Sequence, residues 1–92
     1  MTAYVTVEFT IKNKEMLQSY SAKAASTIAE FGGEFLVKAP IRSLGGVANY
    51  ENKAIVAFPT KERAENWFHS PQYQNLIDIR NQGMESSFLL IA

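Results

Sequence analysis

The sequence predicts an α+β fold in which a four-stranded antiparallel sheet carries helices on one of its faces. Three observations lead to this prediction: short runs with the alternation or apolar content of strands, two longer stretches with helical periodicity, and glycine or proline at most segment ends. The predicted order is β-α-β-β-α-β without an internal repeat, which is the ferredoxin-like layout. Ninety-two residues are expected to form one domain, over residues 1–92.

Residues 3–10 are predicted to form the first strand, because apolar and polar side chains alternate along them. A helix follows. Asn13 is a favourable N-cap, Glu15 lies where the helix dipole favours an anion, and Gly32-Gly33 ends the helix. The inward stripe of this helix recurs at three- and four-residue intervals: Leu17, Tyr20, Ala24, Ile28 and Phe31.

Residues 34–39 are predicted to form the second strand, with Phe35 and Val37 on one face. A proline and a Gly-Gly pair then interrupt any long continuation of the strand. The next segment, residues 40–52, is therefore predicted to be an irregular arm or hairpin whose turn lies at Asn49–Asn52.

Residues 53–58 form the predicted third strand, which Pro59 ends. Thr60 then caps a short helix, and Ser70-Pro71 ends that helix and starts another, since serine suits the N-cap and proline the first helical position. Gly83 closes the second part. The inward positions are Ala64, Trp67 and Phe68 before the break and Tyr73, Leu76, Ile77 and Arg80 after it.

Residues 87–91 form the predicted last strand, and both this strand and the third are apolar on both faces. Two helices can cover only one face of the sheet, and an antiparallel sheet with a solvated face alternates more strictly. A chain of this length also buries only about 60–65% of its unfolded surface. We therefore expect a homodimer that pairs through the sheet faces.

Composition excludes several classes of function. Nine basic and nine acidic side chains cancel, so the sequence offers no electrostatic field for nucleic acid or an anionic membrane. Without cysteine, and with a single histidine, no metal or cofactor site is expected. No apolar run approaches a membrane span, and Met1 leads directly into a strand pattern, so a soluble cytoplasmic protein is expected.

Segments along nearly the whole chain resemble the bacterial domain of unknown function numbered 1330. The matching residues are Ala3-Tyr4-Val5, Tyr20, Phe31-Gly32-Gly33, Ile55 to Pro59, Trp67, Ser70-Pro71, Tyr73 and Arg80. The resemblance implies a dimeric α/β barrel, in a superfamily that includes cofactor-free monooxygenases, haem-degrading enzymes and muconolactone isomerases, with ligands between sheet and helices. Two positions depart from the family pattern: Leu44-Gly45-Gly46 replaces a Leu-Glu-Gly-like segment, and Ala57 replaces a carboxylate.

Four residues are predicted to bind a ligand: Tyr20, Trp67, His69 and Arg80, with His69, Arg80 and Tyr20 as the catalytic candidates. Arg80 shares the core-facing stripe, where a guanidinium needs a partner, so it either clamps an anionic or carbonyl ligand or forms an ion pair with Glu8 or Glu34. His69 is a general base, a haem axial ligand, or a structural or solvent-facing residue at a helix end.

Other polar and aromatic positions have equally open interpretations. Tyr20 either offers its hydroxyl to a ligand or bonds inside the core, and Trp67 either lines a cleft or fills the core. Glu8 is either a buried acid or the partner of Lys38 across the sheet.

Three functions remain open from sequence. The first is binding of a small organic ligand between sheet and helices. The second is cofactor-independent monooxygenase or isomerase chemistry on an aromatic, quinol or lactone substrate, with His69 or Tyr20 moving protons and Arg80 stabilising an enolate. The third is a self-association module without catalysis.

Overall fold

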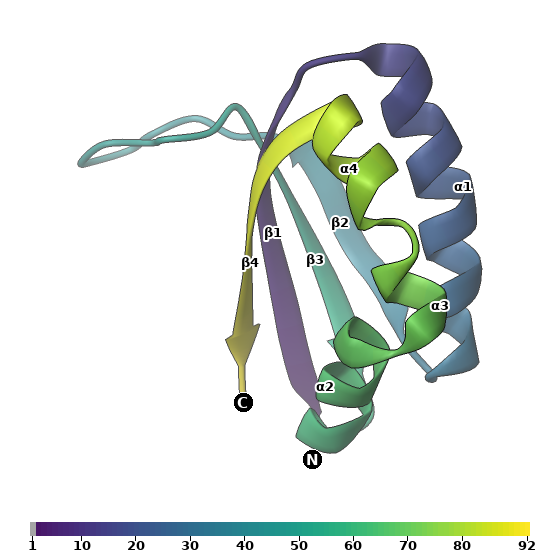
Figure 1. The fold of residues 1–92 in the computed structure, drawn as a ribbon. Coiled ribbons are helices and arrows are strands. Elements are labelled where there is room, and N and C mark those ends of the chain that lie inside the picture. Colours follow the sequence, from purple (N-terminus) through teal and green to yellow (C-terminus); the bar gives the residue numbers. More distant parts are fainter. Residues whose placement is uncertain (1) are drawn as a thin grey trace.

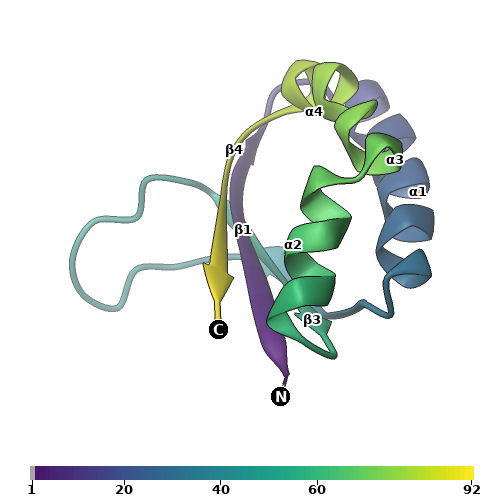
Figure 2. The same cartoon turned by 60° about the horizontal axis from the view of Figure 1, so that its bottom comes forward.

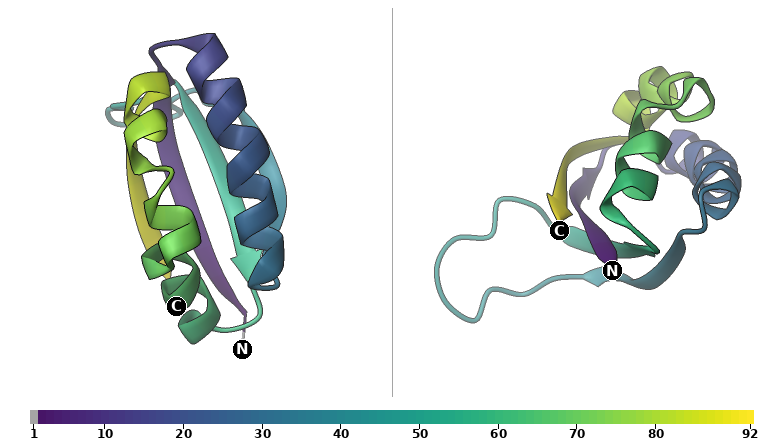
Figure 3. Two further views of the ribbon diagram at one scale, coloured as in Figure 1. Left: turned by 45° about the vertical axis from the view of Figure 1, so that its right-hand side comes forward. Right: turned by 90° about the horizontal axis from the view of Figure 1, so that it is seen from below.

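The computed structural model describes residues 2–92 and has the ferredoxin-like α+β fold (Figure 1). The elements in chain order are β1 (Ala3–Ile11), α1 (Lys14–Glu30), β2 (Glu34–Pro40), β3 (Asn52–Phe58), α2 (Lys61–His69), α3 (Pro71–Gln74), α4 (Ile77–Gly83) and β4 (Met84–Ile91). The four strands form one antiparallel sheet in the order β2-β3-β1-β4. All helices lie on one face of this sheet (Figure 3).

The core lies between the helices and the sheet face that they cover, which we call the inner face. Val5 in β1 pairs with Val56 in β3 and with Leu90 in β4, and paired residues share a face of the sheet. The largest fully buried side chains are Trp67, Tyr73, Phe58 and Val56. The aromatic residues of the predicted inward stripes therefore fill the centre of the molecule.

The first helix forms as its sequence predicts. The Asn13 side chain accepts a hydrogen bond from the Met16 amide, and the stripe from Leu17 to Ile28 is buried. The helix ends where Gly32 adopts a φ of +78°, a left-handed conformation that glycine reaches without a Cβ clash.

The second helical region is broken twice, whereas the sequence predicted one break. Ser70 and Pro71 begin α3 as expected: the Ser70 hydroxyl accepts a hydrogen bond from the Tyr73 amide and donates one to the Trp67 carbonyl. A further break follows Gln74, where the Leu76 amide bonds the Tyr73 carbonyl three residues back. This tighter turn separates α3 from α4, and the periodic apolar stripe that crosses it hides the break in the sequence.

The last strand begins at Met84, three residues before the predicted start at Ser87. The additional residues pair with the end of β1, from Ile11↔Met84 to Phe9↔Ser86. Two polar residues in this part weakened the apolar pattern, but the ladder with β1 holds them in the strand.

A β-bulge in β2 contradicts one prediction about its faces. Phe35 pairs with Val56 on the inner face, and Val37 pairs with Ile55 on the opposite, outer face, because the register shifts between them. The inserted residue is Leu36, so Phe35 and Val37 lie on opposite faces and not on one.

The segment between β2 and β3, residues 41–51, is an irregular arm that extends away from the outer face (Figures 1 and 2). The predicted turn at Asn49–Asn52 is wrong, because Asn52 is already the first residue of β3 and pairs with Phe9 of β1. The chain reverses instead at residues 43–46, where the Ser43 hydroxyl donates a hydrogen bond to the Gly46 carbonyl at 2.7 Å. Gly46 has a φ of +81°, which accounts for glycine at this bend.

None of the helices in the described part of the chain covers the outer face, and large apolar side chains are exposed on it. Leu89 and Ile91 in β4 are 54% and 56% exposed, and Val37 in β2 is 48% exposed. Ile55 and Ala57 of β3 lie between them, on the same face by register. The charged pair of this face is Glu8–Lys53, at 3.4 Å, and not the predicted Glu8–Lys38 pair. Lys38 lies on the inner face, 5.9 Å from the centre of the Phe9 ring.

Candidate functional site

A chain of hydrogen bonds joins three of the helices in the interior of the molecule. The hydroxyl oxygens of Tyr20 in α1 and Tyr73 in α3 lie 2.7 Å apart, and Nη1 of Arg80 in α4 donates to the Tyr73 hydroxyl at 3.1 Å. Both tyrosines are buried, and Arg80 is half-buried. Two predicted site residues, Tyr20 and Arg80, are thus connected through a third that sequence reasoning assigned to the core.

Burial raises the pKa of both phenols above their ordinary value of 10.0. The neighbouring Tyr73 adds to the increase at Tyr20, whereas the positive charge of Arg80 lowers the pKa of each. The two hydroxyls are therefore neutral at physiological pH and serve as hydrogen-bonding groups.

Arg80 lies beside aromatic and polar partners but forms no ion pair with a carboxylate in the described residues. The guanidinium carbon is 4.8 Å from the centre of the Phe88 ring, and Nε donates to Oδ1 of Asn81 at 3.3 Å. The predicted ion pairs with Glu8 or Glu34 are absent from residues 2–92, where the one salt bridge is Glu8–Lys53. A half-buried cation without a counter-charge is suited to an anionic ligand.

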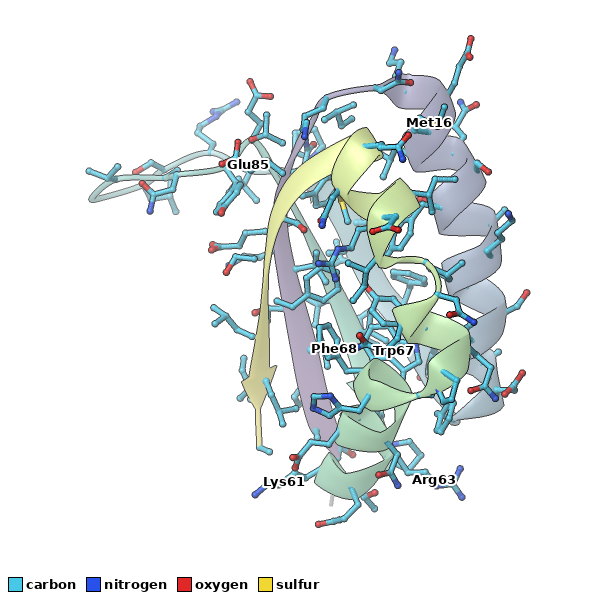
Figure 4. The ribbon with its side chains drawn as sticks, viewed as in Figure 1. Met16, Lys61, Arg63, Trp67, Phe68 and Glu85 are labelled. Atoms are coloured by element: carbon cyan, nitrogen blue, oxygen red, sulfur yellow. The ribbon has the colours of Figure 1, made fainter. Side chains whose placement is uncertain are left out.

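Trp67 belongs to the core. It is 1% exposed, and its indole Nε1 donates to the Thr27 hydroxyl at 3.0 Å; that hydroxyl donates to the Ala24 carbonyl. Trp67 and Phe68 lie between α2 and the sheet (Figure 4). The Trp67 ring is 4.4 Å from the Tyr73 ring, so it supports the hydrogen-bonded chain by packing.

His69 lies apart from that chain, on the other side of Phe68. It is exposed and lines a groove of about 230 Å³ between α2 and β4. Glu65, one helical turn before His69, lines the same groove. The floor is apolar, and the lining residues are Val5, Ala64, Glu65, Phe68, His69, Phe88, Leu89 and Leu90.

Phe88 connects the groove with the rest of the site. Its ring contacts the Arg80 guanidinium, lies 5.6 Å from the Phe68 ring and 6.2 Å from the Tyr73 ring, and also lines the groove. Sequence reasoning missed Phe88, Tyr73 and Glu65. The four-residue spacing of Glu65 and His69 on one helix was the available signal for Glu65.

A second hollow lies deeper, between α1 and the inner face of the sheet. Its volume is about 40 Å³, which accommodates water but not an aromatic ring, and Tyr20 and Trp67 are among its mainly apolar lining residues. The structure thus does not gather the four predicted ligand residues around one cavity. Tyr20 and Trp67 are interior, whereas His69 lies at the groove and Arg80 lies against the groove's Phe88.

The described residues contain no group of three histidine, aspartate or glutamate side chains that could hold a metal ion. Among residues 2–92 there is also no helix with the length and apolar character needed to cross a membrane.

Comparison with solved structures supports the fold. A protein of unknown function from Rhodopseudomonas palustris superposes with a TM-score of 0.79 at 12% identity, over 98% of this chain and 80% of its own. SnoaB, a cofactor-independent oxygenase from Streptomyces nogalater, gives 0.72 at 14% identity, over 99% and 91%. A dimeric ferredoxin-like protein of unknown function from Jannaschia sp. CCS1 gives 0.66 at 18% identity, over 97% and 98%.

These identities are low, so the solved structures establish the fold alone. No curated protein matches the sequence. The family comparison is more direct, because the model of a domain of unknown function, DUF1330, matches residues 2–92. The resemblance carried by the segments around Tyr20, Trp67, Ser70-Pro71 and Arg80 is confirmed, and the chain belongs to the DUF1330 family.

Proposed function

We propose that the protein binds a small planar organic anion in the groove between α2 and β4. The observation that carries this proposal is the juxtaposition of an open hollow of about 230 Å³, two aromatic walls and a polar rim. Phe68 and Phe88 offer rings for stacking, and His69 offers a hydrogen bond at the rim.

The preference for an anion comes from Arg80. Its guanidinium lies on the Phe88 ring that lines the groove, and no carboxylate of the described residues neutralises it. Tyr73 and Asn81 accept hydrogen bonds from Nη1 and Nε, which orients the planar group. A carboxylate or enolate near Phe88 would supply the missing negative charge.

Binding can be tested with 1-naphthoate as an anionic probe and 2-naphthol as a neutral one. His69 is the only histidine, so the carbon-bound protons of its imidazole give unique NMR signals that report on the groove. We expect saturable shifts with 1-naphthoate and an approximately tenfold weaker Kd in Arg80→Met, which corresponds to about 1.4 kcal/mol. Affinity for 2-naphthol is expected to change little.

Arg63→Met is the matched control, because it removes an exposed guanidinium from α2 outside the groove. Equal losses in the two variants would contradict a specific role for Arg80. No shift of the His69 signals with either probe at millimolar concentration would contradict the proposed binding function.

A second candidate is cofactor-independent catalysis in the same groove, on an aromatic, quinol or lactone substrate. Two observations favour it: His69 and Glu65 share the groove, and SnoaB, with the same fold, is described as a cofactor-independent oxygenase. In this function His69 would accept a substrate proton and Arg80 would stabilise the resulting enolate. Oxygen uptake with a naphthohydroquinone, above the spontaneous rate and abolished in His69→Ala, would support it. If the probe binds but no oxygen uptake is observed, ligand binding alone would remain as the proposed function.

We also propose that two copies pair through their outer sheet faces. The support is an exposed apolar patch that no element within residues 2–92 covers; it is formed by Val37, Ile55, Ala57, Leu89 and Ile91. The similar structure from Jannaschia is described as dimeric. If a dimer forms and no ligand binds, self-association alone remains as the function.

Size-exclusion chromatography with light scattering tests this pairing. We expect a dimer at micromolar concentration and a monomer for Val37→Asp/Ile91→Asp, since the two charges would be buried in the interface. Met16→Asp is the control, because Met16 is an exposed apolar residue on the helical side (Figure 4). A monomeric wild-type protein would overturn the proposal.

A further inference from the structure

The arm, residues 41–51, is anchored only at its base. There the Ile41 amide donates to the Glu51 carbonyl at 3.0 Å, and the Glu51 amide donates to the Thr10 hydroxyl at 3.2 Å. Beyond this base the two limbs extend from the sheet on the side opposite the helices, as all three ribbon views agree (Figures 1, 2 and 3).

The tip of the arm is apolar and almost fully exposed. Leu44 is 100% exposed and Val47 is 89% exposed, with Gly45 and Gly46 between them. A Cβ added at either glycine would meet nothing within 4 Å. Two large apolar side chains in this setting contribute nothing to the stability of the monomer, and they are typical of a surface that contacts another molecule.

The arm also leaves space next to the outer face of its own sheet. A hollow of about 350 Å³ lies between Glu8 on that face and the arm residues from Ile41 to Asn49. The arm therefore stands clear of its own sheet and does not close the exposed apolar patch.

The reach of the arm fits a second copy of this chain as its partner. From the base at Ile41 to the tip at Leu44 the chain advances three residues, which span up to roughly 10 Å when extended. Two sheets that pack face to face are separated by about 10 Å. In the proposed dimer the tip would accordingly reach the level of the opposite sheet and lie against the second copy.

We infer that each protomer's arm clasps its partner, burying Leu44 and Val47 against the edge of the partner's sheet. This inference rests on the proposed homodimer. In a two-fold symmetric dimer the contact occurs twice, once for each arm. The two tips thus add to the interface that the sheet faces form. The occupant is thus a second copy of this chain.

The absence of cysteine allows a direct test. A spin label on Leu44→Cys would be attached at the sole thiol of the protein. We expect its electron paramagnetic resonance spectrum to show an immobilised label in the dimer and a mobile one in the monomeric Val37→Asp/Ile91→Asp background. A mobile label in a wild-type-like dimer would overturn the clasp while leaving the dimer intact.

Affinity provides the second measurement, with a conservative variant as control. Leu44→Asp is expected to raise the dimer Kd at least tenfold, because a buried leucine is lost from both arms. Leu44→Met preserves the apolar contact and is expected to stay within about twofold. An unchanged Kd in Leu44→Asp would overturn the clasp, and a wild-type protein that is monomeric throughout would overturn both the clasp and the dimer.

Discussion

At the scale of single residues, the structure distinguishes side chains that could contact a ligand from those that hold the core. Tyr20 and Trp67 bond internal partners, Tyr73 and Thr27, and neither needs a ligand to satisfy its polar group. Arg80 bonds Tyr73 and Asn81 but has no carboxylate partner in residues 2–92, and His69 is exposed at the groove. The residues that we propose as ligand contacts are therefore these two, of the four predicted, together with the ring of Phe88.

Sequence periodicity could predict that Tyr20 and Arg80 face the core, because each lies on a helical stripe. It could not predict their connection, since Tyr73 is indistinguishable from any core aromatic until three helices are packed together. The ion-pair partner of Glu8 could not be predicted for a related reason. The pairing with Lys53 depends on strand register, and the bulge in β2 changes the expected register of Lys38.

The Tyr73 hydroxyl is expected to contribute more to stability than the Tyr20 hydroxyl. In Tyr73→Phe, the buried Tyr20 hydroxyl and Nη1 of Arg80 both lose a hydrogen-bond partner. We therefore expect the free energy of unfolding to decrease by about 1–3 kcal/mol. In Tyr20→Phe, Tyr73 keeps its bond to Arg80, so a loss of about 1 kcal/mol is expected. Urea denaturation of both variants measures the difference, and equal losses would show that the Arg80 contact is not significant for folding.

The same two phenols predict a loss of stability at alkaline pH. Their pKa values are raised in the folded state, so the unfolded chain releases phenolic protons near pH 10 that the folded chain retains. The free energy of unfolding is therefore unaffected by the ionisation of these groups below pH 10. Above pH 10 it decreases by up to about 1.4 kcal/mol per pH unit for each tyrosine. Urea unfolding at pH 9 to 11.5 measures this slope. Tyr20→Phe removes one of the two protons, and a wild-type slope in this variant would contradict the assignment.

At the scale of elements, local signals predicted the helix ends better than the strand ends. Asn13, Thr60 and Ser70 cap helices as expected, because a cap depends on a few neighbouring residues. The start of β4 and the turn of the arm depend on pairing with β1 and β3, which no local pattern contains. The break between α3 and α4 shows the same limit, since the apolar stripe continues across it.

One methyl group added at Gly83, where α4 meets β4, is expected to destabilise the fold strongly. A Cβ on Gly83 would lie 2.7 Å from the amide nitrogen and 2.8 Å from Cα of Leu17, both backbone atoms of α1. The Gly83 carbonyl also accepts bonds from the Lys12 and Asn13 amides. We expect Gly83→Ala to destabilise the fold by at least about 1–3 kcal/mol, because α1 and α4 must separate.

Gly45→Ala is the control for this prediction, with both substitutions made in the monomeric Val37→Asp/Ile91→Asp background, because nothing of its own chain lies within 4 Å of a Cβ at that position. Its midpoint of thermal unfolding is expected to stay unchanged or to rise slightly. A Gly83→Ala midpoint equal to that of Gly45→Ala would show that the two helices are not packed as closely as described.

At the scale of the whole molecule, the amino-acid sequence predicted the topology and the incomplete covering of the sheet. Both followed from two observations: two helical regions cover only one face, and the third and last predicted strands are apolar on both faces. The structure places Ile55, Ala57, Leu89 and Ile91 on the uncovered face. The direction of the arm could not be predicted, because it depends on the bond of Glu51 to Thr10 in β1 and on the bond of Ile41 to Glu51.

The proposed pairing makes thermal stability depend on protein concentration. If the dimer is the stable folded form, unfolding releases two chains from one, so mass action raises the midpoint as concentration increases. Scanning calorimetry from 5 to 500 μM is expected to show an upward shift for the wild type and none for Val37→Asp/Ile91→Asp. The tip variant Leu44→Asp should lie between them, since it removes the clasp but retains the sheet faces. A concentration-independent wild-type midpoint would instead mean that one copy buries enough surface to fold alone, and the apolar outer face would then need a different partner.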